Sequence, residues 1–196
     1  YMSGVCLVLL AIWSLSLYLH QPGRAWWSYT GWILAALGAA YNHYFSLLTV
    51  GVVGLLALLI VPRSKIPGYF LSGGLILAGF APHIPITLGH LEKEGLSWLG
   101  APEVTFFWNF LRYLTHYSTV MLVLWMVLLA GGLVFHFRYR QEPADQRIRF
   151  RYLLFGAFGI PALVGFVYSV LVEPVLQFSS LVFALPLLFI AGCSLL

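Results

Sequence analysis

Long runs of apolar residues, separated by short groups of charged residues, prolines and glycines, dominate this 196-residue sequence. Seven runs can be distinguished, at 3–19, two within 26–61, and at 69–88, 117–137, 152–172 and 178–196. Apolar residues surround each expected helix instead of following one face, which is typical of helices embedded in lipid. The pattern therefore predicts an all-α, polytopic transmembrane helix bundle of about seven spans, with residues 1–196 forming a single transmembrane domain.

The run at 26–61 is too long for one helix that crosses a bilayer, because about 20 residues are enough. Asn42 and His43 are the polar residues that interrupt it. We therefore predict two helices that meet in a tight turn near residues 41–44.

Composition supports the membrane assignment. Hydrophobic residues make up 61% of the chain and charged residues 8%, whereas soluble domains carry about 25% charged residues. Intrinsic disorder is excluded, since it requires low hydrophobicity and high charge. The net charge of +4 arises from only ten basic and six acidic residues, so it does not indicate a nucleic-acid partner. We expect the lipid bilayer to be the main partner.

Basic residues gather on one side of the expected spans. The segment before the sixth run contains five arginines, Arg138, Arg140, Arg147, Arg149 and Arg151. The positive-inside rule places the loop from Arg138 to Arg151 in the cytoplasm. Because each span changes the side, Arg24, Arg63 and Lys65 also fall inside. The turn at 41–44 and the long loop at 89–116 then fall outside.

The outer turn holds the first candidate ligand. Asn42 and His43 would be costly in the bilayer core, so we expect them at an interface or in a cavity. At the start of the third helix, His43 meets free backbone N–H groups and the positive end of the helix dipole. This setting favours a neutral imidazole and a nearby anion such as phosphate. The alternative is an interfacial aromatic belt, with His43 bonded to a neighbouring helix.

The long outer loop holds two more candidates. Residues 106–113 predict an amphipathic helix at the membrane surface. Arg112 on this helix is a candidate anion contact, because guanidinium binds phosphate in bidentate fashion; the alternative is snorkelling to the interface. His116, at the outer start of the next helix, is a second candidate ligand, and the alternative there is an ordinary Ser or Thr helix cap.

Cofactor and metal motifs are not evident in the sequence. Cys6 and Cys193 lie in apolar runs and do not predict a disulfide or a metal framework. The loop carboxylates Glu92, Glu94 and Glu103 are weak candidates for a base or a metal ligand, since a catalytic carboxylate needs a partner and the sequence supplies none.

Two segments resemble a known family. Residues 41–48 (Tyr-Asn-His-Tyr-Phe-Ser-Leu-Leu), preceded by Trp-Trp-Ser-Tyr at 26–29, resemble the Y-T-H-Y-F-x-L-L segment of bacterial membrane glycosyltransferases of the GT-C superfamily, the group of the dolichyl-phosphate-mannose protein mannosyltransferases (glycosyltransferase family 39). Residues 173–180, followed by Leu-Pro at 185–186, are similar to the family's P-x-F-x-x-R-Y-L-L-x-x-L-P entry into a late helix. Ser179 stands where the family has its arginine.

This resemblance implies a function and a location. It implies transfer of a sugar from a polyprenyl-phosphate-linked donor on the periplasmic face of the bacterial inner (cytoplasmic) membrane, which agrees with the predicted sidedness. His43 and Tyr44, with Asn42 beside them, would face the cavity for sugar or lipid phosphate, and Arg112 and His116 would help to hold the leaving phosphate.

The resemblance also implies that part of the enzyme is missing. The family's catalytic acidic residue lies in a first outer loop, so the base is expected upstream of Tyr1. We therefore expect this chain to be the C-terminal part of a longer enzyme and to be inactive alone. A divalent metal is possible in the full-length enzyme, although no ligand set is seen here.

Two other classes of protein remain as alternatives. A transporter or flippase core would use broken helices, which Gly73-Gly74 and Pro82 with Pro85 in the fourth run could mark. No Asp, Glu, Lys or Arg falls in the middle of an expected span, which counts against ion coupling. The third class is a non-catalytic membrane scaffold of a polysaccharide assembly system.

Overall fold

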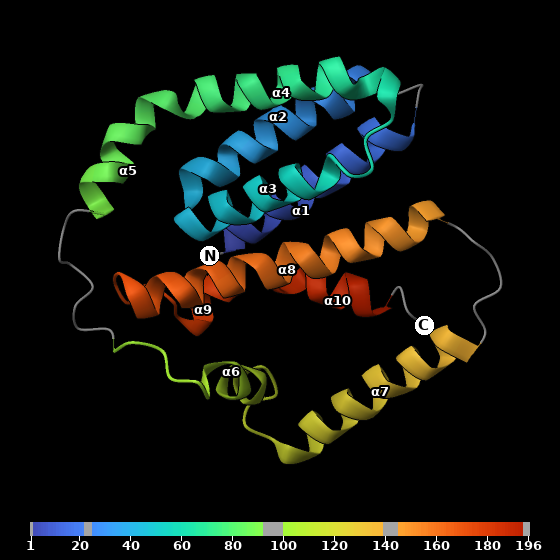
Figure 1. The fold of residues 1–196 in the computed structure, drawn as a ribbon, viewed down its shortest axis with the longest axis vertical. Helices are drawn as coiled ribbons and strands as arrows, with labels where there is room; N and C mark the ends of the chain where they lie inside the picture. The colour runs from blue at the N-terminus through green and yellow to red at the C-terminus, as the bar shows by residue number, and fades with distance from the viewer. Residues whose placement is uncertain (1, 22–24, 92–99, 139–144, 194–196) are drawn as a thin grey trace.

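The structure, a computed structural model, describes residues 2–21, 25–91, 100–138 and 145–193, and all regular elements in them are helical (Figure 1). The helices are α1 (Met2–His20), α2 (Ala25–Asn42), α3 (Tyr44–Ala57), α4 (Ile66–Phe80), α5 (Ile84–Leu91), α6 (Phe106–Leu114), α7 (Thr119–Arg138), α8 (Asp145–Leu171), α9 (Phe178–Leu181) and α10 (Leu185–Cys193). Two 3₁₀ turns, η2 (Arg63–Lys65) and η3 (Ala81–His83), precede α4 and α5. The all-α prediction is confirmed for the described residues.

Within the described residues, three or four candidate membrane spans can be recognised by length and composition. Three segments are long and apolar enough to cross a membrane, Met2–His20, Arg63–His90 and Tyr152–Leu171. A fourth is obtained if the bent pair Phe106–Leu114 and Thr119–Gly132 is one span. The apolar helices indicate a membrane protein, but about seven spans are not confirmed.

Helix length and composition explain the difference. The 14 residues of α3 extend only about 21 Å at 1.5 Å per residue, against a hydrocarbon core of about 30 Å. The 18 residues of α2 are enough in number, but its first half is rich in Trp, Ser, Tyr and Thr. The last predicted run is divided between the short helices α9 and α10.

The break between α2 and α3 falls where the sequence predicts it. Asn42 ends α2 and Tyr44 begins α3, so His43 alone separates the two helices. The two helices also pack against each other. The predicted tight turn in the run 26–61 is therefore confirmed.

Helices with small residues at their contacts form the main core. Helix α1 packs against α2 and α3, α2 packs against α4, and α8 packs against α3 and α10. Small side chains let helix backbones approach closely, which is how helices associate in lipid. Fully buried alanines of this core lie on five of the described helices: Ala11, Ala39, Ala57, Ala157 and Ala191.

Buried hydrogen bonds attach α4 to α2. Trp32 Nε1 on α2 donates to the hydroxyl of Ser72 on α4 over 3.1 Å, and both side chains are buried. The Ser72 hydroxyl donates in turn to the carbonyl of Tyr69 over 2.7 Å. The hydroxyl of Tyr41 donates to the carbonyl of Gly79 over 2.8 Å. The Trp32–Ser72 bond attaches the first half of α4 to α2, and the Tyr41–Gly79 bond attaches its far end, just before η3 and α5.

The connections between the helices lie at two opposite ends of the bundle. At one end, which we call the Lys65 end, the ammonium of Lys65 donates to the carbonyls of Tyr18 and Leu19 in the last turn of α1. At the opposite end, which we call the His43 end, Asn42 Nδ2 donates to the hydroxyl of Ser3 over 3.0 Å. Figure 1 places α5 and the α8–α9 connection toward the His43 end, and the start of α8 and the end of α7 toward the other.

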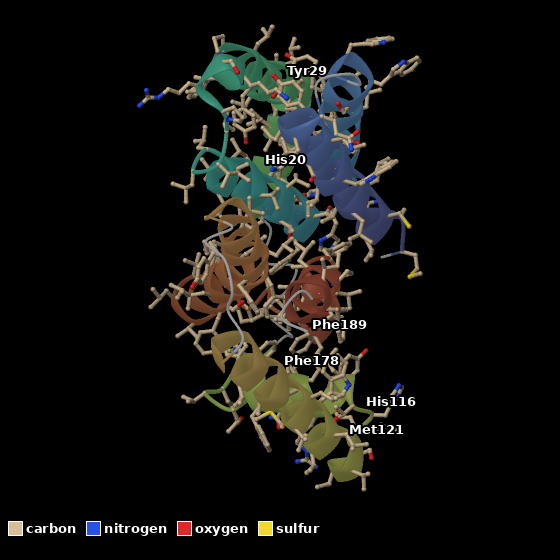
Figure 2. The ribbon with its side chains drawn as sticks, turned by 90° about the vertical axis from the view of Figure 1, so that its right-hand side faces the viewer. His20, Tyr29, His116, Met121, Phe178 and Phe189 are labelled. Atoms are coloured by element: carbon tan, nitrogen blue, oxygen red, sulfur yellow. The ribbon has the colours of Figure 1, made fainter. Side chains whose placement is uncertain are left out.

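Helices α6 and α7 form a corner, with their axes bent by 99°. Helix α6 agrees with the amphipathic helix predicted at 106–113. Its inner face packs on α9, because the ring of Phe178 lies 5.0 Å from Phe106 and 5.8 Å from Phe110. Figure 2 shows Phe178 and Phe189 between the α6–α7 corner and the rest of the bundle. Part of the apolar face thus meets protein, whereas Trp108 stays exposed.

Two helix boundaries differ from the sequence reading. Helix α8 begins at Asp145, so Arg147, Arg149 and Arg151 belong to a helix and not to a loop. The fourth run continues through η3 and α5 to Leu91, so the first residues of the predicted outer loop 89–116 are helical. Residues 139–144 of the arginine-rich segment lie outside the described residues.

Candidate functional site

His43 is the centre of the candidate site at the His43 end. It is the N-cap residue of α3, with extended backbone angles of φ −164° and ψ 147°. Its Nδ1 accepts a hydrogen bond from the backbone N–H of Phe45 over 3.1 Å. Because Nδ1 is an acceptor, a neutral imidazole carries its proton on Nε2. The backbone N–H that we expected to meet an anion therefore meets the imidazole itself.

The surroundings of His43 favour the uncharged ring. The side chain is half-buried, and its ring centroid lies 4.8 Å from that of Phe183, which follows α9. Burial lowers the pKa of His43 below the ordinary value of 6.5, since a charged imidazolium loses hydration there. This agrees with the neutral imidazole expected from the sequence, with its proton on Nε2.

Tyr44 connects the site to α5. Its hydroxyl lies 2.6 Å from Nδ1 of His90, close to the end of α5, and both side chains are exposed. A second pair makes a similar contact, because the ring of His83 lies 5.0 Å from that of Tyr41. His90 and His83 were not singled out in the sequence. His90 lies just after the fourth run predicted at 69–88, next to the outer loop, whereas His83 lies inside that run beside Pro82.

Asn42 is held between the ends of two helices. In addition to its bond with Ser3, its Oδ1 lies against the backbone of Gly4, together with the ring of Phe183. Gly4 is buried and leaves no room for a side chain there. Asn42, His43 and Tyr44 thus lie in one cluster at one end of the bundle, with Ser3, His90 and Phe183 around them.

Arg112 and His116 lie elsewhere, on the α6–α7 corner. Both side chains are exposed, and the guanidinium carbon of Arg112 lies 5.7 Å from the centroid of the Tyr117 ring. His116 and Tyr117 have positive φ angles of 50° and 58°. No contact described for Arg112 or His116 reaches Asn42, His43 or Tyr44. The predicted set of five residues is therefore divided between two places.

The hydroxyl of Ser118 acts as a cap at the start of α7. It accepts a hydrogen bond from the backbone N–H of Met121 over 3.4 Å, a long bond for this donor and acceptor. A Ser or Thr helix cap is the alternative that the sequence analysis gave for the segment 115–118. The role of His116 as a ligand stays a prediction.

Glu173 is a candidate that the sequence reading treated only as the residue that stops a helix. It follows α8 in the connection to α9, and its Oε1 is buried without a hydrogen-bond partner in the part of the chain that the structure describes. Glu103, by contrast, is exposed and accepts from the hydroxyl of Thr105 over 3.2 Å. Glu92 and Glu94 lie outside the described residues.

Metal binding has little to support it in this arrangement. Among the described residues, no three His, Cys, Asp or Glu side chains come together in a group that could hold a metal ion. Within the same residues, the polar groups around His43 are imidazoles, hydroxyls and amides, and the α8–α9 connection at this end adds the single carboxylate of Glu173. Such groups suit hydrogen bonds with a polar or anionic ligand.

Comparisons with known proteins add no relative from which a function could be transferred. No protein-family model matches this chain, and searches of curated proteins and of solved structures find no match either.

Proposed function

We propose that this chain is part of an integral membrane glycosyltransferase that transfers a sugar from a polyprenyl-phosphate-linked donor. The observation that carries the proposal is the cluster of Asn42, His43 and Tyr44 with His90 and Ser3 at one end of an otherwise apolar bundle. Polar side chains in membrane helices are costly and tend to mark functional sites. A substrate with an apolar tail and a polar sugar-phosphate head fits such a site.

The chemistry of the cluster suits the head of this donor. The imidazole, amide and phenol groups of His43, Asn42 and Tyr44 are of the types that donate or accept hydrogen bonds without carrying a charge. Neutral donors can hold a phosphate without fixing a permanent charge near the membrane. The carboxylate that activates the acceptor hydroxyl by general-base catalysis is proposed to lie upstream of Tyr1.

On this proposal, Arg112 and His116 act at a second point of contact. Arg112 is exposed on α6, which meets the long apolar helix α7 at a corner. A guanidinium at the end of an apolar helix suits the phosphate level of a lipid. The two residues would attract the lipid phosphate at the membrane surface, while the His43 cluster holds the sugar end.

The site is proposed to face the periplasm of a bacterial inner membrane, and the Lys65 end the cytoplasm. Support comes from the arrangement of the helices, because Arg63 and Lys65 lie at the end opposite His43 and the start of α8 lies with them (Figure 1). Positively charged residues favour the cytoplasmic side.

The test is transfer of sugar by the full-length, membrane-embedded protein from polyprenyl-phosphate glucose, mannose and galactose. His43→Ala and His43→Asn are compared with the wild type. Loss of one hydrogen bond of about 1.4 kcal/mol corresponds to about tenfold, so we expect at least about a tenfold loss of kcat/KM in both variants. His43→Asn is informative because asparagine is a good N-cap residue and preserves the start of α3.

His20→Ala is the matched control. His20 is an exposed histidine in the last turn of α1, where its Nδ1 lies 2.8 Å from the carbonyl of Ser16. This substitution should leave transfer unchanged because the residue lies at the other end of α1 from the site. Unchanged transfer by both His43 variants would remove His43 from the site, and no transfer by the wild type would remove the glycosyltransferase proposal.

One observation favours a transporter or flippase as a second candidate. The segment Arg63–His90 changes from α-helix to the 3₁₀ turn η3, which contains Pro82, and α5 then reaches the His43 end. Broken helices line substrate sites in many transporters. Transbilayer movement of a fluorescent polyprenyl-phosphate sugar in proteoliposomes, without hydrolysis or transfer, would support this candidate instead.

A further inference from the structure

The connection between α8 and α9 is held firmly at the His43 end. The hydroxyl of Ser169, a buried residue of α8, accepts hydrogen bonds from the backbone N–H groups of Val175 over 3.0 Å and Leu176 over 2.8 Å. The backbone N–H of Glu173 donates to the carbonyl of Tyr168 over 3.2 Å. One serine thus ties two consecutive amides of the connection, and the position of Glu173 is fixed by its own backbone bond.

This connection shares a packed cluster with the residues around His43. Leu176 is buried together with Phe45 and Phe183. Phe45 donates its backbone N–H to His43, and the ring of Phe183 lies 4.8 Å from the imidazole. The loop that bears Glu173 therefore belongs to the same end of the molecule as the candidate site.

One oxygen of the Glu173 carboxylate has no hydrogen-bond donor among the described residues. Its Oε1 is buried and makes no hydrogen bond within the described residues, although the side chain as a whole is partly exposed. No Lys or Arg in the described part of the chain forms an ion pair with it. A buried carboxylate oxygen without a donor is unfavourable, so the side chain gains stability when a ligand supplies one.

We propose that Glu173 accepts a hydrogen bond from a hydroxyl group of the sugar carried by the lipid-linked donor. This inference rests on the proposed glycosyltransferase function. A hydroxyl donating to a carboxylate makes a charge-assisted bond, which is stronger than a bond between neutral groups. The terminal torsion of glutamate is broad and roughly two-fold, so the carboxylate can turn its unpaired oxygen toward a hydroxyl on the exposed side. Glu173 thereby selects a sugar that has a hydroxyl at one ring position.

The experiment combines substitution of Glu173 with removal of single hydroxyls from the donor. Wild type, Glu173→Gln and Glu173→Ala are assayed in the full-length, membrane-embedded protein with polyprenyl-phosphate glucose, mannose and galactose. The donor used best is then replaced by its monodeoxy analogues. Glu103→Gln is the matched control, since Glu103 is exposed and bonded to Thr105, and it should leave kcat/KM unchanged.

We expect Glu173→Ala to lower kcat/KM for the complete sugar by about 10- to 150-fold, the range for a lost hydrogen bond to a charged group. One deoxy analogue should lower kcat/KM of the wild type by a similar factor. With that analogue, Glu173→Ala should have the same kcat/KM as the wild type. The other analogues should keep the full effect of the substitution. Glu173→Gln keeps the shape of the side chain and should lie between the wild type and Glu173→Ala.

Three results would overturn the inference. Equal losses with every deoxy analogue would indicate a structural role for Glu173 in the α8–α9 connection. Undiminished transfer by Glu173→Ala, while His43→Ala is impaired, would remove Glu173 alone and leave the proposed function standing. No transfer by the wild type with any donor would overturn the proposed function and this inference together.

Discussion

At the scale of single residues, His43 combines two structural roles with the proposed chemical one. Its Nδ1 caps α3 and its ring lies against Phe183, so the backbone and the packing both fix the direction of Nε2. A side chain held in this way is well suited to binding, because little conformational freedom remains to be lost. Because the ring is held in this partly buried position, the free energy of unfolding depends on whether the imidazole is charged.

The pH dependence of stability should report this charge state. Burial lowers the pKa of His43 in the folded chain below 6.5, so the unfolded chain binds the proton more readily. The contribution of the neutral ring is fully present above about pH 6.5 and is lost as the pH falls through the lower, folded pKa. The free energy of unfolding in mixed micelles should therefore decrease on acidification.

His43→Asn isolates the effect from the other histidines. Asparagine can cap α3 but does not titrate, so the acid-dependent decrease should be smaller in this variant than in the wild type. Identical pH profiles for the two proteins would mean that His43 is as well hydrated in the folded chain as in the unfolded one.

Gly4 is a second residue whose identity is set by its neighbours. A Cβ atom at this position would overlap Oδ1 of Asn42 and the ring of Phe183. Forcing extra atoms into a packed contact costs about 1–3 kcal/mol, so Gly4→Ala should lower the stability in micelles by about this amount. Because it pushes on Asn42 and Phe183, it should also lower the proposed sugar transfer.

Gly51→Ala is the control for the glycine substitution. Gly51 lies in α3 with open space around it, since no atom lies within 4 Å of an added Cβ. Alanine is favoured over glycine inside a helix by roughly 0.5–1 kcal/mol, so this variant should be as stable as the wild type or more stable. A destabilised Gly51→Ala would show that the helix interior, and not the contact at Gly4, determines the result.

At the scale of elements, the sequence predicted the helices better than it predicted how they end. The break at His43 could be foreseen because Asn42 and His43 are polar residues within a long apolar run. The fourth run, predicted at 69–88, does continue through η3, since Pro82 and Pro85 are compatible with the first turns of new helices, but its end at Leu91 lies beyond the predicted one. Helix α8 extends through Pro161, which lies inside it, and begins before the apolar run does.

The bond between Trp32 and Ser72 is the element contact that can be tested most directly. Ser72→Ala leaves Nε1–H of the buried Trp32 without its acceptor. An unsatisfied buried donor costs about 1–3 kcal/mol, so the variant should unfold at a lower denaturant concentration in mixed micelles. Ser64→Ala, at an exposed position in η2, should behave as the wild type. Equal stability of both variants would mean that α2 and α4 are held by apolar packing alone.

At the scale of the whole molecule, hydropathy predicted where the helices lie in the sequence, but it could not predict which helices pack against one another. The sequence placed Arg112 and His116 on the same side of the membrane as His43, but it could not show that they lie on a separate corner. That corner depends on the 99° bend between α6 and α7 and on the packing of Phe106 and Phe110 against Phe178. Glu173 was missed because an acidic residue before a proline is typical of a helix end, and only the fold shows that the α8–α9 connection packs at the His43 end.

The orientation of the bundle can be tested with one cysteine on each side of the segment Arg63–His90. Ser64 lies in η2 at the Lys65 end, and Val104, which lies shortly before α6, has a side chain that is 93% exposed. Each is replaced by cysteine in a separate variant. In a background with Cys6→Ser and Cys193→Ser, a membrane-impermeant maleimide should label Val104→Cys from the periplasmic side of intact spheroplasts. Ser64→Cys should react only in inverted vesicles.

The two cysteines are separated by a single predicted span, so the result depends on that span and not on the total number of spans. If both cysteines react from the same side, α4 and α5 do not cross the membrane together. The chain would then turn back at η3, where Ala81–His83 interrupts the helix, and the segment would be re-entrant. His90 would still contact Tyr44, but the assignment of the His43 end to the periplasm would have to be reversed or abandoned, because it relies on each apolar run changing the side.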